Sequence, residues 1–111
     1  MILKNCTFFN ENFEKEYGDI EIESGKIKQI GILDGDGKDM AGKIIIPGFI
    51  DVHIHGCAGG DASDADKSGL EKMAKELAKH GVTSFCPTSM TLPKERLESI
   101  VETIKEFKEE N

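Results

Sequence analysis

The chain has 111 residues, of which 38% are hydrophobic, and a formal net charge of −7. This composition is typical of a globular protein, whereas the acidic excess and the single arginine, Arg96, argue against nucleic-acid binding, which requires clustered Lys and Arg. No apolar run reaches the roughly 18 to 20 residues that cross a bilayer, which excludes a membrane helix. The three cysteines are an odd number, and the first residues lack the basic and apolar regions of a signal peptide, so we expect a cytoplasmic protein with reduced thiols.

Residues 1–46 show short apolar segments separated by turn residues. Strands are expected over residues 2–9, 18–23 and 26–30, because Ile20 and Ile22 alternate with acidic neighbours and Ser24-Gly25 marks a turn before the next apolar pair. This pattern predicts a small antiparallel sheet.

Residues 47–111 change to a strand, a glycine-rich loop, a helix, a strand and a second helix. Ser68 and Glu71 predict a capping box at the first helix, and Gly81 marks its end. A short strand follows over residues 82–86, and Pro93 stands near the start of the second amphipathic helix. Alternation of apolar strands with helices indicates a parallel sheet covered by helices.

The run from Ile44 to Gly56 reads as an apolar strand that ends in His53-x-His55. Alternate residues of a strand share a face, so both imidazoles are expected on one side with Asp51 behind them. Neutral imidazoles suit zinc, iron, nickel or copper, but a catalytic site generally has at least three protein ligands. The remaining histidine, His80, is expected in the last turn of a helix, where a cation complements the helix dipole, and not as a ligand.

The segment Pro47-Gly48-Phe49-Ile50-Asp51-Val52-His53-Ile54-His55-Gly56 resembles the first barrel strand of the amidohydrolase superfamily. Two further segments, Gly59-Gly60-Asp61 and the run from Gly81 to Thr91, are most similar to the N-acetylglucosamine-6-phosphate deacetylase family. The resemblance implies an α/β fold with a (β/α)₈ TIM barrel and a small β-sandwich domain. A barrel takes about 250 residues, so the resemblance implies part of the sandwich over 1–46 and the first two βα units over 47–111.

The resemblance also implies a metal-dependent hydrolase, with zinc or iron as cofactor, that releases acetate from an amino sugar phosphate. His53 and His55 are then metal ligands, and Asp61 belongs to an active-site loop. Asp51 is expected either to orient the ligands or to be a buried hydrogen-bond acceptor, because metal-bound imidazoles need their second nitrogen held. No catalytic proton carrier is expected within the chain. Some family members replace the His-x-His pair by other polar residues and use one metal ion, which is bound by residues later in the sequence. Two alternatives stay open: another amidohydrolase that acts on cyclic amides or dipeptides, and a catalytically inactive fragment. Exposed strand edges lead us to expect a homo-oligomer.

Overall fold

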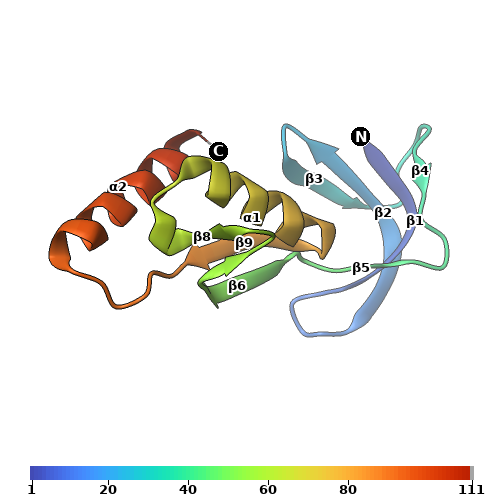
Figure 1. The fold of residues 1–111 in the computed structure, drawn as a ribbon. Helices are drawn as coiled ribbons and strands as arrows, with labels where there is room; N and C mark the ends of the chain where they lie inside the picture. The colour runs from blue at the N-terminus through green and yellow to red at the C-terminus, as the bar shows by residue number, and fades with distance from the viewer. Residues whose placement is uncertain (111) are drawn as a thin grey trace. The chain divides into compact units, whose positions relative to one another are not determined.

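The computed structural model describes residues 1–110, which fall into two compact units, Met1–Pro47 and a second unit that begins at Gly48. Each unit is described by itself (Figure 1). Unit 1 contains the strands β1 (Ile2–Phe9), β2 (Lys15–Glu23), β3 (Lys26–Gly31), β4 (Lys38–Asp39) and β5 (Ile44–Ile45). Unit 2 contains β6 (Phe49–Ile54), β7 (Gly56–Cys57), β8 (Gly60–Asp61), the 3-10 helix η1 (Ala62–Asp64), α1 (Lys67–Lys79), β9 (Val82–Pro87) and α2 (Lys94–Glu110).

Unit 1 is a single mixed sheet with the strand order β3-β2-β1-β4, in which β5 also pairs with β1. The strands β1, β2 and β3 form the expected antiparallel meander. The expectation of a purely antiparallel sheet is wrong at one edge, because β4 and β5 both run parallel to β1. Buried side chains of Cys6, Phe8 and Ile20 form the core of this unit.

One carboxylate, that of Asp19, is buried in unit 1 with 6% of its surface exposed. It accepts hydrogen bonds from Lys4 Nζ at 2.8 Å, from the backbone N–H of Leu33 at 3.0 Å and from that of Asn5 at 2.9 Å. These donors lower the pKa of Asp19 to about 2, with the Lys4 hydrogen bond as the largest cause. The buried charge is therefore fully partnered and ties β1 to β2 and to the segment after β3.

The apolar run from Ile44 to Gly56 is not one strand, which corrects the prediction from sequence. Ile44–Ile45 pairs with β1 in unit 1, and a new strand, β6, begins at Phe49 in unit 2. The physical reason is Pro47, which has no backbone N–H to give to a sheet and restricts the residue before it. The histidine pair therefore belongs to a shorter strand than the sequence suggested.

In unit 2 the strands β6 and β9 form a parallel pair, with α1 on the connection between them. The predicted capping box of Ser68 and Glu71 is wrong, because Asp66 is the N-cap of α1 and accepts hydrogen bonds from the backbone N–H groups of Ser68 at 3.0 Å and Gly69 at 3.1 Å. An acidic N-cap satisfies the free N–H groups of the first turn directly. The buried side chains of unit 2 are Ala62, Leu70, Met73 and Ile100.

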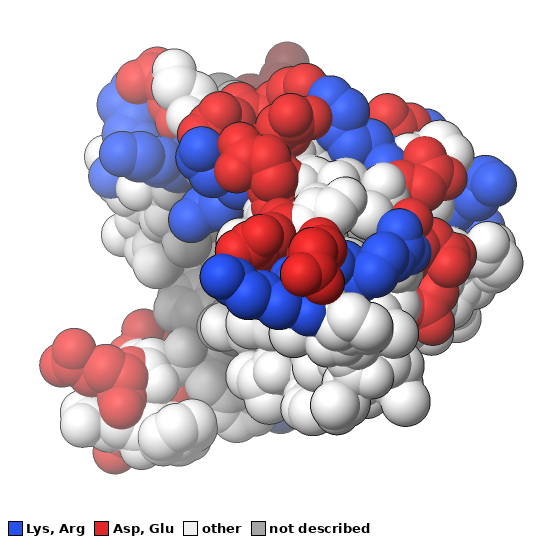
Figure 2. All heavy atoms as spheres, turned by 60° about the vertical axis from the view of Figure 1, so that its left-hand side comes forward, with Lys and Arg blue, Asp and Glu red and all other residues white. Residues whose placement is uncertain are grey.

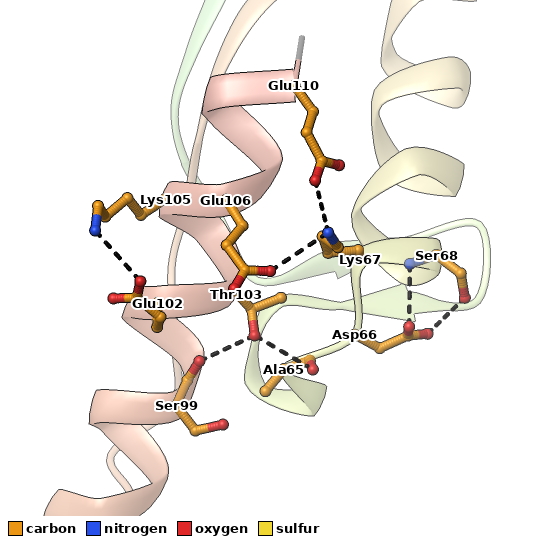
Figure 3. Close-up of polar contacts among 10 residues, drawn as sticks. All are labelled: Ala65, Asp66, Lys67, Ser68, Ser99, Glu102, Thr103, Lys105, Glu106 and Glu110. Atoms are coloured by element: carbon orange, nitrogen blue, oxygen red, sulfur yellow. Dashed lines mark hydrogen bonds and ion pairs between the residues drawn. The ribbon is translucent and has the colours of Figure 1, made fainter.

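Polar contacts join α2 to Ala65, which lies just before α1, and to Lys67, the first residue of α1 (Figure 3). Lys67 Nζ lies 2.8 Å from Glu110 Oε1 and 3.3 Å from Glu106 Oε2, and Thr103 Oγ1 lies 3.4 Å from the carbonyl oxygen of Ala65. The hydrogen bonds from Lys67 to Glu110 and then to Glu106 raise the pKa of the Lys67 ammonium. These exposed ion pairs align the two helices with little effect on stability.

Acidic and basic side chains are interspersed on the face of the molecule in Figure 2, and the described residues of that face form no continuous basic patch. This surface agrees with the net negative charge of the sequence. Among residues 1–110, no helix is long and apolar enough to cross a membrane.

Candidate metal centre

The strand β6 brings the two sequence-predicted histidines together at its carboxyl end. His53 is the penultimate residue of the strand, and His55 follows directly after its last residue, Ile54. The Nε2 atoms of His53 and His55 are 3.3 Å apart, with the ring planes 77° from each other. The expectation that both side chains lie on one side of the strand is therefore confirmed.

This separation fits a shared metal ion. Two imidazole nitrogens bonded to one tetrahedral zinc ion at roughly 2.0–2.1 Å lie about 3.3–3.4 Å apart. The observed 3.3 Å between the Nε2 atoms matches that distance. His53 is exposed and His55 half-buried, so a metal ion from solvent has access to the pair.

The ring of His55 is oriented by a backbone group. Its Nδ1 lies 2.9 Å from the carbonyl oxygen of Thr88, which follows β9. A carbonyl oxygen only accepts hydrogen bonds, so Nδ1 is the donor, and in the neutral imidazole the Nε2 lone pair is left free toward His53. Metal-binding histidines generally have their second nitrogen held in this way.

Asp51 contacts the backbone of the histidine segment as a hydrogen-bond acceptor. Its Oδ1 accepts a hydrogen bond of 3.1 Å from the backbone N–H of His53. The carboxylate therefore fixes the backbone at the strand end, whereas the carbonyl of Thr88 holds the imidazole of His55. The assignment of Asp51 as a residue that orients a ring nitrogen stays a prediction.

Asp61 lies in the hairpin that follows the histidine pair. The strands β7 and β8 are joined by Ala58 and Gly59, both with positive φ, as two-residue turns of this kind require. Asp61 Oδ1 accepts a hydrogen bond of 2.7 Å from the backbone N–H of Ser63 and caps η1. In these contacts the side chain shapes the loop, and its role in an active site stays a prediction.

The other sequence candidates lie outside this arrangement. His80 is the C-cap residue of α1, and its Nε2 lies 3.4 Å from Glu76 Oε1. Cys57 Sγ lies 3.9 Å from the carbonyl oxygen of Met73. Across residues 1–110, no three side chains of His, Cys, Asp or Glu gather closely enough to hold a metal ion. Among the described residues, the pair of His53 and His55 therefore has no third side chain of these types gathered with it.

Sequence reasoning missed the carbonyl of Thr88 as the partner of His55. The signal for it was indirect: Thr88 follows the strand that pairs with β6 in parallel, so its backbone reaches the same edge of the sheet. Its N–H also donates to the carbonyl oxygen of Ile54 at 2.8 Å, which anchors this peptide beside the histidines. Backbone groups are common to all residue types, and no residue pattern marks this one.

Curated proteins similar to this chain include N-acetylglucosamine-6-phosphate deacetylases and dihydroorotases. The N-acetylglucosamine-6-phosphate deacetylase of Lysinibacillus sphaericus is 40% identical over 95 residues, which cover 82% of this chain and 24% of the relative. The dihydroorotase of Listeria welshimeri is 36% identical over 117 aligned positions, which cover 97% of this chain and 26% of the relative. The chain thus spans about a quarter of the length of these relatives.

Solved structures give a consistent result. The N-acetylglucosamine-6-phosphate deacetylase of Thermotoga maritima matches with a TM-score of 0.83 and 30% identity, over 100% of this chain and 29% of that chain. The enzyme of the same name from Pasteurella multocida matches with a TM-score of 0.87 and 25% identity, over 99% of this chain and 31% of that chain. The resemblance to deacetylases drawn from the sequence is confirmed. The amidohydrolase family model matches residues 44–110, which are more than half of this chain, and the chain therefore belongs to the amidohydrolase family.

Proposed function

We propose that this chain supplies the first two βα units of a metal-dependent amide hydrolase whose substrate is N-acetylglucosamine 6-phosphate. The observation that carries the proposal is the pair of imidazoles with Nε2 atoms 3.3 Å apart at the carboxyl end of a parallel strand. Active sites of (β/α)₈ barrels lie at that end of the strands. Unit 1 is then part of the accompanying β-sandwich domain.

The exposed surface of β6 supports a continuation of the sheet into a barrel. Phe49, Ile50 and Val52 are 58%, 67% and 74% exposed, although parallel strands are normally covered on both faces. Further strands and helices of a barrel account for such apolar side chains. The matched relatives, of which this chain covers about a quarter, leave room for those elements.

His53 and His55 are the residues that would hold a divalent metal ion, with zinc or iron as the expected cofactor. A bound divalent metal supplies Lewis acidity, which polarises an amide carbonyl and activates water near neutral pH. The chain itself presents the Nε2 lone pair of His55 and keeps its Nδ1 proton on the carbonyl of Thr88. The further ligands and the group that moves the proton lie outside the two histidines, since a catalytic site generally needs at least three ligands.

The assignment of the substrate rests on the deacetylases among the similar proteins and structures. A second candidate, hydrolysis of a cyclic amide, is supported by the dihydroorotase match, which covers 97% of this chain against 82% for the deacetylase. Both reactions cleave an amide. The substrate is therefore the finer part of the proposal and requires its own experiment.

Metal binding is tested first, by titrating the purified chain with Co²⁺ and following the absorption of the bound ion. We expect one binding event that is lost in the variant His53→Gln/His55→Gln and retained in His80→Gln. His80 is a matched control, because it is the third histidine and caps the C-terminal end of α1, outside the pair. Equal Co²⁺ binding by all three proteins would contradict the assignment of His53 and His55.

The substrate is tested with chimeras, because the chain alone lacks a full set of ligands. Residues 44–110 replace the matched segment in the Lysinibacillus sphaericus deacetylase and in the Listeria welshimeri dihydroorotase. We expect metal-dependent acetate release from the first chimera and no activity from the second. The reverse result would favour the cyclic-amide reaction. The isolated chain should release no acetate above a control that contains the metal alone, and saturable release would overturn the proposal that it is an incomplete barrel.

A further inference from the structure

Ser63 connects the two loops that leave the carboxyl ends of β6 and β9. Its Oγ accepts a hydrogen bond of 3.0 Å from the backbone N–H of Met90, which follows β9. Its carbonyl oxygen accepts a hydrogen bond of 2.9 Å from Nη2 of Arg96, in the first turn of α2. The hydroxyl and the carbonyl of Ser63 thus hold the segment after β9 and the first turn of α2 against η1.

The same two loops also hold His55. The backbone N–H of Ala62, next to Ser63, donates to the carbonyl oxygen of His55 at 2.8 Å. The carbonyl of Thr88, two residues before Met90, accepts from Nδ1 of His55 at 2.9 Å. Hydrogen bonds and short stretches of chain therefore form a closed ring that passes through the backbone and the side chain of His55.

Ser63 is the residue that closes this ring. The sheet ends at Pro87, so the direction of the carbonyl of Thr88 depends on the path of residues 88–90 as well as on the pairing of β9. The bond from Met90 to Ser63 Oγ fixes the far end of that path. Without the hydroxyl, Thr88 keeps the hydrogen bonds from its N–H to the carbonyl of Ile54 and from its Oγ1 to the carbonyl of Cys86, and neither of these reaches η1.

We propose that Ser63 is a positioning residue for the candidate metal centre. Its hydroxyl holds the loop after β9, and this loop holds the Nδ1 proton of His55 so that Nε2 faces His53. Arg96 supports the same contact from α2. The importance of this role for metal binding rests on the proposed function, whereas the effect on the imidazole of His55 does not.

The experiment uses ¹⁵N-histidine-labelled chain at a pH near 8.5, where imidazoles are ordinarily neutral, and magic-angle-spinning NMR, which does not require a monomer. The chain has three histidines, so single His→Gln variants assign each ring. In Ser63→Ala we expect the ratio of Nδ1–H to Nε2–H forms of His55 to fall about two- to fivefold, because at most one net hydrogen bond is weakened. Ser63→Thr, which retains the hydroxyl, should restore the ratio.

Two controls separate positioning from a general loss of structure. Ser99→Ala removes an exposed hydroxyl on α2 and should leave the ratio unchanged, and Arg96→Ala should change it in the same direction as Ser63→Ala. Far-UV circular dichroism must match in all variants. In Co²⁺ titrations we expect the dissociation constant of Ser63→Ala to rise about threefold or more, below the roughly 10- to 100-fold that loss of a direct partner of a ligand costs.

The outcomes distinguish this inference from the proposed function. A Ser63→Ala variant with an unchanged His55 ratio, in a chain that binds Co²⁺ normally, overturns the positioning role and leaves the metal site standing. A chain that binds no Co²⁺, but in which Ser63→Ala still changes the ratio, overturns the metal site and supports the positioning role. A loss in Ser63→Ala that Ser63→Thr does not repair also overturns the inference, since the hydroxyl is then not the cause.

Discussion

A close approach between β8 and α1 makes two glycines of unit 2 respond oppositely to the same substitution. A Cβ atom on Gly60 would lie 2.3 Å from the carbonyl oxygen of Gly69 and 2.8 Å from its carbonyl carbon. Both atoms belong to the backbone of α1, so the contact opens to at least 3.0 Å only if the hairpin and the helix separate. Gly60→Ala should therefore be strongly destabilising.

The control is Gly69→Ala, on the other side of the same contact. A Cβ atom there would have Cα of Gly60 as its nearest neighbour, at an ordinary distance of 3.5 Å. Gly69 lies in the first turn of α1, where alanine is preferred over glycine by about 0.5–1 kcal/mol. We expect Gly60→Ala to lower the free energy of unfolding by about 2–3 kcal/mol, the upper range for overpacking, and Gly69→Ala to raise it by about 0.5 kcal/mol.

Thermal unfolding followed by circular dichroism at 222 nm measures both effects, because the helices of the described residues all lie in unit 2. For a unit of this size, the expected changes correspond to a fall in Tm of about 10–20 °C for Gly60→Ala and a rise of a few degrees for Gly69→Ala. Equal shifts in the two variants, or an unchanged Tm in Gly60→Ala, would show that the hairpin does not pack on α1 as described.

Three further predictions concern the core, the acid response and the exposed strand. Met73→Ala should lower the free energy of unfolding by about 2–5 kcal/mol, because this side chain is 0% exposed, and urea unfolding should show it. The pKa of Asp19 is about 2 in the folded chain against an ordinary 3.8, so its stabilisation is present above about pH 4 and lost as the pH falls toward 2; Asp19→Asn should flatten this part of the stability profile. The chain should self-associate in sedimentation velocity, and Ile50→Lys/Val52→Lys should shift it toward monomer, since both residues are exposed on β6; a monomeric parent chain would contradict this reasoning.

Local patterns predicted most of the regular structure. The apolar segment over residues 2–9 matches the bounds of β1, and the apolar spacing with Gly81 gives a helix that ends just before that residue. Pairings between distant segments were harder: β4 and β5 have two residues each, and two residues carry too little pattern to indicate a parallel partner. Pro47 was visible in the sequence, but the length of the apolar run around it concealed its effect on the strand.

The candidate site, too, could be predicted from the sequence only in part. The spacing of His53 and His55 predicted their shared side, because a strand has a fixed two-residue period. The carbonyl of Thr88 and the hydroxyl of Ser63 were not predictable, since their roles depend on where two loops meet after the strands end. Polar contacts that depend on loop paths require coordinates.

The parallel edge of unit 1 has a consequence for the order of events during synthesis. Leu3 of β1 pairs with Lys38 of β4, which is 35 positions later in the chain (38 against 3). Thr7 of β1 pairs with Ile44 of β5, which is 37 positions later (44 against 7). At ribosomal rates of about 5–20 residues per second, this edge of β1 stays open for roughly 2–7 s after its own residues are made. The meander of β1, β2 and β3 depends on shorter loops and should form first. During that interval an unpaired strand is accessible to other nascent chains, so the yield of folded protein should depend on the speed of translation between residues 9 and 45.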